Sequence, residues 1–137
     1  MNVELVTVSG KAMYRLTLPD GAIRTGAAPE TLATLREATQ AAHARRQRLR
    51  QDEAAGLVLI RHCIGTGADA TEARADVART QAAITEAAQE ADRLEALAEE
   101  VSAAATEAYA APLRHQYQAA IAATVAALPT IPGDPNA

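Results

Sequence analysis

The chain is poor in aromatic residues and in cysteine, and both shortages narrow what it can be. Its 137 residues include no Phe, no Trp and only three aromatic side chains, Tyr14, Tyr109 and Tyr117. A core without aromatic rings lacks the usual large fillers, so it has to be built from aliphatic side chains and alanine. The single cysteine, Cys63, excludes a disulfide within the chain and cannot complete a cysteine-rich zinc site.

Long apolar runs are missing as well. No stretch approaches the roughly 20 consecutive apolar residues that span a bilayer. Residues 1–4 open without the basic start and apolar run of a signal peptide, so we expect a cytoplasmic chain that is not secreted by a recognisable signal. The formal net charge of −4 is mild, which argues against a dedicated nucleic-acid binder.

Residue patterns for catalysis and ligand binding are also absent from the sequence. His62 and Cys63 are adjacent, and adjacent side chains diverge by about 100° on a helix and point to opposite faces of a strand, so they make no nucleophile–base pair. Gly65-Thr66-Gly67 lacks the Gly-Lys-Ser/Thr ending of a phosphate-binding loop and indicates a turn. The histidines have no metal-ligand spacing. We therefore expect no enzyme activity, no catalytic residue, no cofactor and no metal.

What the chain has in excess is alanine at regular intervals. One series recurs every seven residues and a second repeats it three residues later: Val77, Ile84, Ala91, Ala98 and Ala105, then Thr80, Ala87, Leu94, Val101 and Ala108. This spacing predicts a helix that packs lengthwise on another helix. Because each alanine removes little apolar surface from water, the stability of such a scaffold should depend on its length and on partners.

The first 26 residues predict a small β-structure. Residues 3–8 and 13–18 are rich in β-branched residues and alternate imperfectly, which indicates two strands joined by a turn. Pro19-Asp20-Gly21 is a strong turn signal, because Pro presets φ and Gly accepts a positive φ. Residues 22–25 are a candidate third strand. A sheet this small is marginal alone and must lean on a helix or on another chain.

A first helix should open after Gly26, with Pro29 in its first turn. Its apolar face is narrow and includes Leu35, Ala42 and Leu49. Its far end is ambiguous, because residues 57–64 are too short a run for periodicity to separate a helix from a strand.

A second helix should run from about Ala70 to Ala110, with Asp69 or Thr71 as its cap. Pro112 is expected to interrupt it or to start a new helix. A short C-terminal helix should follow, with apolar residues mostly four apart: Leu113, Tyr117, Ile121, Val125 and Leu128.

The two long helices differ in charge. Residues 36–61 hold six arginines and three acids, a net charge of +3, whereas residues 69–107 hold ten acids and three arginines, a net charge of −7. If the chain reverses near Thr66, facing residues have numbers that sum to about 132, which places Arg46 opposite Glu86. Pairing of the same helices between subunits explains the pattern equally well. Exposed ion pairs contribute only about 0–1 kcal/mol each, so charge should set orientation more than stability.

We predict a helix–helix interface that combines both apolar faces with this ion pair: Leu35, Ala42, Arg46, Leu49, Val77, Ile84, Glu86, Leu94 and Val101. The basic cluster at residues 45–50 is centred on the apolar face and has no aromatic nearby to stack on bases, so it indicates helix packing more than contact with phosphates. The carboxylates of the second helix indicate a solvated face, with a docking surface as the alternative.

Two segments carry a family resemblance, Tyr14–Thr25 (YRLTLPDGAIRT) and Pro29–Arg36 (PETLATLR). Together they resemble part of the small head–tail joining proteins of tailed phages, which have a β-hairpin with a turn at Asp-Gly and then a helix that opens with Leu-x-x-Leu. The resemblance implies a non-enzymatic virion assembly protein that works in a ring, and it adds the virion to the expected locations.

These patterns predict a mostly α-helical fold in three parts. An N-terminal β-hairpin or three-strand meander covers residues 1–26, a long antiparallel helical hairpin with a short C-terminal helix covers residues 27–128, and an extended Pro-rich tail covers residues 129–137. The expected function is that of a structural or assembly protein, a homo-oligomer or part of a larger assembly, with protein partners and neither membrane nor nucleic acid. The alternative is a small acidic adaptor or inhibitor that docks its acidic helix on a basic surface.

Overall fold

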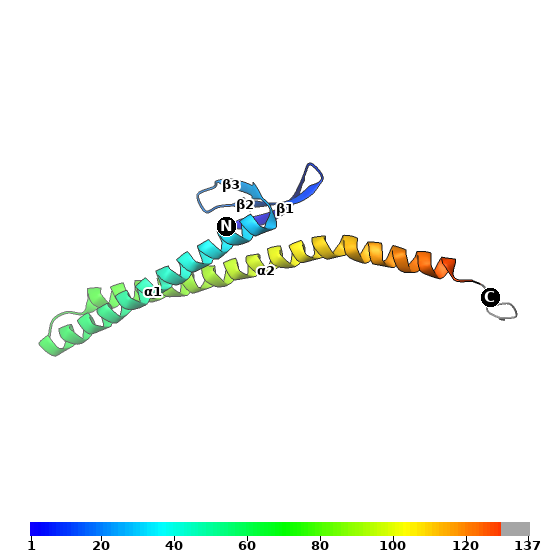
Figure 1. Cartoon of the computed structure of the whole chain (residues 1–137). Helices are drawn as coiled ribbons and strands as arrows, with labels where there is room; N and C mark the ends of the chain where they lie inside the picture. The colour runs from blue at the N-terminus through cyan, green and yellow to red at the C-terminus, as the bar shows by residue number, and fades with distance from the viewer. Residues whose placement is uncertain (130–137) are drawn as a thin grey trace. The chain divides into compact units, whose positions relative to one another are not determined.

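A computed structural model describes residues 1–129 (Figure 1). An antiparallel three-strand sheet comes first in the chain and two long helices follow it: β1 (Asn2–Val8), β2 (Lys11–Thr17), β3 (Ile23–Gly26), α1 (Ala28–Thr66) and α2 (Thr71–Ala127). The predicted fold class, mostly helical with an N-terminal three-strand meander before a helical hairpin, is therefore confirmed. The tail predicted for residues 129–137 lies, from residue 130 on, outside the described residues.

The chain divides into two compact units, Met1–Ser102 and Ala103–Ala137, and each is described by itself. The core belongs to the first unit, where the buried side chains begin at Tyr14 and end at Val101. In the described part of the second unit, residues 103–129, no side chain is buried. Within residues 1–129, neither long helix has a stretch that is apolar and long enough to cross a lipid bilayer.

The sheet is a meander in the order β1-β2-β3 with two tight turns. Ser9 and Gly10, with φ of 52° and 77°, form the two-residue turn between β1 and β2, and two positive φ values give a turn whose twist matches that of paired strands. At the second turn, Gly21 has φ of 84° and the Asp20 carboxylate accepts a hydrogen bond of 3.0 Å from the Ala22 N–H. Both predicted turns are confirmed.

The sheet packs on the first turns of α1. Tyr14 and Leu16 lie on the same face of β2 and are 4% and 2% exposed, and α1 contacts both β2 and β3. Thr31 and Leu35 are the buried residues on this part of α1. The small sheet therefore rests on a helix of its own chain, which supplies the apolar cover that three short strands need.

Helix α1 begins with Pro29 in its first turn and ends at Thr66, where Gly67 takes a left-handed conformation with φ of 74°. The N–H of Ala68 donates to the carbonyl oxygen of Cys63 at 2.9 Å, which satisfies a carbonyl at the end of the helix. Residues 57–64 are helical, so of the two alternatives for this segment the helix is right.

Helix α2 begins at Thr71, and Asp69 is the residue that caps it. The Asp69 Oδ1 accepts hydrogen bonds from the backbone N–H and the hydroxyl of Thr71, at 3.0 and 2.7 Å. The helix then continues through Pro112 to Ala127, so the expected interruption is wrong and the short C-terminal helix is a continuation of α2. Proline removes one backbone hydrogen bond from the helix, and the many alanines around it, with the highest helix propensity, favour continuation of the helix on both sides.

Candidate interaction surfaces

Within the first unit, α1 and the first part of α2 lie side by side and run in opposite directions (Figure 1). Two close approaches join them. A Cβ built on Gly56 would lie 2.6 Å from the Cγ2 of Val77, and the His43 Nε2 lies 3.0 Å from the Glu95 Oε1. The predicted chain reversal at Gly65-Thr66-Gly67 therefore pairs the two helices within one chain.

The inward-facing residues of both helices repeat with alternating steps of three and four, the pattern of a coiled coil. On α1 the buried or half-buried series is Leu32, Leu35, Thr39, Ala42, Arg46, Leu49, Glu53, Gly56, Ile60 and Cys63. On α2, within the first unit, it is Ala70, Ala73, Val77, Thr80, Ile84, Ala87, Ala91, Leu94, Ala98 and Val101. We call these two series the helical seam. The α2 series follows the predicted alanine stripe from Val77 to Val101, and of the two stripe positions in the second unit Ala105 is half-buried and Ala108 is exposed.

At the close approach of Gly56 to Val77 the residue numbers sum to 133, and at the contact of the longer side chains of His43 and Glu95 they sum to 138. The sequence predicted about 132. Extended along the helical seam, the Gly56–Val77 sum pairs position 46 with position 87, which is buried. Glu86, one residue earlier, is turned about 100° away and is exposed.

The nine predicted interface residues lie at different depths. Five are buried: Leu35, Ala42, Val77, Leu94 and Val101. Three are half-buried: Arg46, Leu49 and Ile84. Glu86 is exposed, and it makes no ion pair with Arg46, whose Nε is buried without a hydrogen-bond partner. Instead Arg45 lies with Glu86 and Glu90 around a shallow hollow of about 410 Å³.

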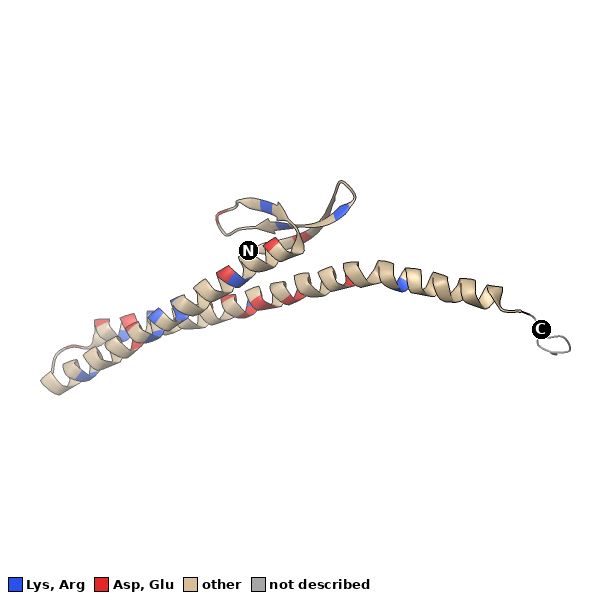
Figure 2. Cartoon of the chain, viewed as in Figure 1, with Lys and Arg blue, Asp and Glu red and all other residues tan. Residues whose placement is uncertain are grey.

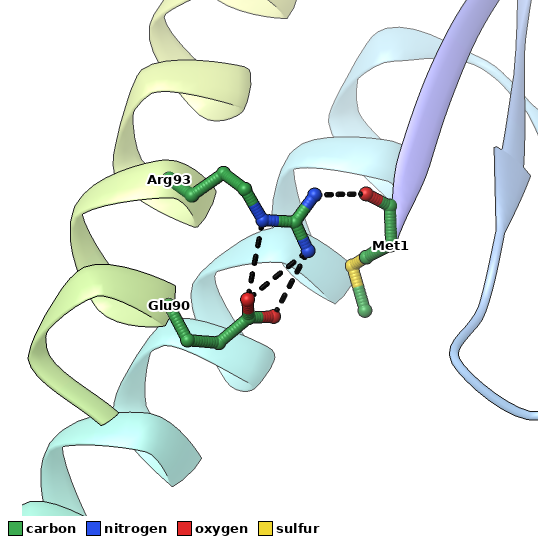
Figure 3. A network of polar contacts seen from close by, with 3 residues as sticks. All are labelled: Met1, Glu90 and Arg93. Atoms are coloured by element: carbon green, nitrogen blue, oxygen red, sulfur yellow. Dashed lines mark hydrogen bonds and ion pairs between the residues drawn. The ribbon is translucent and has the colours of Figure 1, made fainter. Parts of the chain in front are cut away.

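A polar network joins the N-terminus to α2 (Figure 3). The Arg93 guanidinium donates to the Glu90 carboxylate, with an Nη2–Oε2 distance of 3.0 Å, and to the carbonyl oxygen of Met1 at 2.7 Å. No sequence pattern predicts this contact, because Met1 and Arg93 are 92 residues apart. The network ties the start of the sheet to the helical hairpin.

The side chains that could bind a metal ion or take part in catalysis are scattered along the chain. Within the described residues, no three His, Cys, Asp or Glu side chains gather closely enough to hold a metal ion. Cys63 is half-buried as a free thiol in the helical seam, and its neighbour His62 is exposed. A hollow of about 380 Å³ lies beside Met1 and Pro19. Four alanines line it, together with Arg45, Arg48, Glu90 and Leu94.

In the second unit, six large apolar side chains lie on the exposed surface of α2. They are between 46% and 74% exposed and comprise Tyr109, Leu113, Tyr117, Ile121, Val125 and Leu128. We call them the C-terminal apolar face. Arg114 is the single charged residue between positions 108 and 129, and it forms an ion pair with Glu107. Figure 2 shows how few charges this part of α2 carries compared with the residues before it.

Comparison with protein-family models, with curated proteins and with solved structures found no match. The resemblance of residues 14–36 to head–tail joining proteins therefore stays a prediction.

Proposed function

We propose that the protein is a non-enzymatic structural or assembly component, and that it works by joining protein surfaces. The head–tail resemblance suggests a phage particle as the setting. The observation that carries the proposal is the C-terminal apolar face, because large apolar patches on an exposed surface mark sites of protein–protein contact.

The lack of tertiary packing around residues 109–128 supports the same proposal. A helix of about 20 residues without tertiary packing is marginal in water, even when it is rich in alanine. The described part of the second unit contains no other secondary structure that could pack on residues 109–128. Burial against a protein partner would supply the missing stabilisation.

Sedimentation of the chain in extracts of the cells that make it tests the proposal. The chain should travel with particles much heavier than its own 14.3 kDa. Ile121→Glu should return it to light fractions, because it places a charge in the C-terminal apolar face. Ala119→Glu adds the same charge on the other side of the helix and should leave the chain in the heavy fractions. Wild-type chain that sediments at its own mass would contradict the proposal.

The exposed acids on the first part of α2 favour a second candidate, an acidic adaptor. Glu72, Asp92, Glu99 and Glu100 are exposed on a helix segment with a strongly negative net charge (Figure 2). An adaptor of this kind would form a one-to-one complex that weakens with salt. Glu99→Lys combined with Glu100→Lys should break such a complex, whereas Ile121→Glu should not.

A further inference from the structure

We propose that the C-terminal apolar face binds the same face of a second copy of this chain. This inference rests on the proposed assembly function and names the partner for that function. Three properties of the face select a second copy: its charge, its spacing and its area.

The charge of the face selects a partner that is itself nearly free of charge. From residue 108 to residue 129 the chain carries only Arg114, and that cation is paired with Glu107. A partner that buried its own charges against this face would leave them unpaired, which is costly. Over longer ranges the other helical segments carry net charges, +3 over residues 36–61 and −7 over residues 69–107. Near the end of α1, Leu57, Val58, Leu59 and Ile64 are also exposed and apolar, but Arg61 interrupts that patch. The same face of another copy is the longer apolar match.

The spacing of the face selects a partner with the same helical pitch. Its six residues from Tyr109 to Leu128 cover 19 positions in five steps, a mean of 3.8 residues. The helical seam repeats every 3.5 residues on average. An apolar stripe with a mean spacing below 3.6 residues winds around its helix in a left-handed sense, and one with a larger spacing winds in a right-handed sense. The helical seam and the C-terminal apolar face therefore cannot stay in contact over several turns. Another copy of residues 109–128 supplies the matching pitch.

The size of the face is compatible with association of two or more copies. Tyr109 and Tyr117 are 74% and 69% exposed. Burying two such rings removes on the order of 300 Å² from water in each copy. The four aliphatic side chains bring the total toward the roughly 800 Å² per partner of a standard interface. Alanines between the large residues, such as Ala110 and Ala120, let the helices approach closely.

Light scattering and sedimentation equilibrium of the purified full-length chain test the inference. The wild-type mass should be a multiple of 14.3 kDa at micromolar concentration. Ile121→Glu should shift the chain to monomer, with a dissociation constant raised at least 100-fold. Ala119→Glu should keep the wild-type mass, because residues two apart on a helix point about 160° apart. Unchanged thermal melting of the first unit in both variants excludes misfolding as the cause.

Crosslinking then locates the contact. In a Cys63→Ala background, Tyr117→Cys should form a disulfide between copies, whereas Gln118→Cys should form little. A photo-crosslinker at position 117 should attach to residues 109–128 of the other copy. A monomeric wild type, equal effects of the two Glu variants, or attachment within residues 28–102 would each overturn the inference.

Two outcomes separate this inference from the proposed function. If the purified chain is monomeric but travels with heavy particles in extracts in a way that depends on Ile121, self-association fails and the assembly function stands. If the purified chain self-associates through Ile121 but travels in extracts only as that small oligomer, self-association stands and the assembly function fails.

Discussion

Gly56 occupies a place in the helical seam where no side chain fits. A Cβ there would come within 2.6 Å of the Val77 Cγ2, and valine, branched at Cβ, has little freedom to turn away. We expect Gly56→Ala to lower the free energy of unfolding by about 1 kcal/mol. Overpacking costs about 1–3 kcal/mol, and the helix propensity of alanine returns up to about 1 kcal/mol. Urea unfolding followed by circular dichroism measures the difference.

Gly65 provides a matched control in the same helix. A Cβ at this position would meet nothing within 4 Å, so only the helix propensity changes. Gly65→Ala should raise the free energy of unfolding by about 0.5–1 kcal/mol. If both substitutions stabilised the chain equally, α1 and α2 would not approach closely at Gly56.

The carboxyl of Asp69 is more acidic than that of an ordinary aspartate. The hydrogen bond from the Thr71 hydroxyl, then the one from the Thr71 N–H, and a smaller effect of Arg74 hold the pKa of the Asp69 carboxyl below its ordinary value of 3.8. Because the pKa is lower in the folded state, the carboxylate stabilises the fold above pH 3.8 and loses that contribution as the pH falls through the lowered pKa.

The thermal midpoint of Asp69→Asn should therefore lie below that of the wild type at neutral pH, and the gap should close as the pH drops below 3.8. Thr71→Val supplies the control, since it keeps the carboxylate and removes the hydroxyl. In that variant, an NMR titration should find the pKa of Asp69 closer to 3.8. A gap that stays constant down to low pH would show that Asp69 does not cap α2.

At the scale of the elements, the helical seam carries two charged residues where coiled coils usually place apolar ones. Arg46 and Glu53 are half-buried and seven residues apart on the inward face of α1. Polar groups at such positions cost stability and specify register, because a shifted register would bury them against the wrong neighbours.

A disulfide between cysteines at positions 46 and 87 tests this register. In a Cys63→Ala background, Arg46→Cys with Ala87→Cys should oxidise within one chain, because the Gly56–Val77 sum of 133 pairs the two positions. Arg46→Cys with Glu86→Cys should oxidise more slowly, since position 86 is turned about 100° away. If the disulfide between positions 46 and 86 formed faster, the helices would pair in the register predicted from the sequence, with a sum of 132. If disulfides formed only between chains, the two helices would pair across a subunit interface.

At the scale of the whole molecule, all buried side chains of the described residues belong to the first unit. A chain truncated after Ser102 should therefore keep a thermal midpoint close to that of the dilute full-length protein. Truncation after Arg93 removes Leu94 and Val101, both 2% exposed, and should cost several kcal/mol, because each large core side chain contributes about 2–5 kcal/mol. Circular dichroism melting compares the three chains. A chain ending at Ser102 that is unfolded would show that the second unit supports the core.

Much of the candidate seam could be read from the sequence, because a heptad repeat reports which side of a helix is apolar. The series from Val77 to Val101 was predicted in that way and is buried or half-buried. The predicted ion pair of Arg46 with Glu86 does not form, because the register of the two helices depends on where the turn begins and ends to within one residue. The contact of Arg93 with Met1 had no sequence signal at all.

What the sequence determined by itself were the features that depend on neighbouring residues. Gly10, Gly21 and Gly67 take positive φ where turns need them, and Asp69 caps the helix that follows it. Local sterics and hydrogen bonds act over a few residues, so the order of residues is enough to specify them.

Only the tertiary structure decided features that local preference leaves open. Residues 57–64 suited a helix or a strand, and they are helical where α1 packs on α2. Pro112 could have stood at the end of a helix or inside one, and α2 continues through it. Gly56 approaches Val77 only because the two helices pack side by side. Packing selects among locally equivalent conformations, since residues far apart in sequence meet only when the helices are in place.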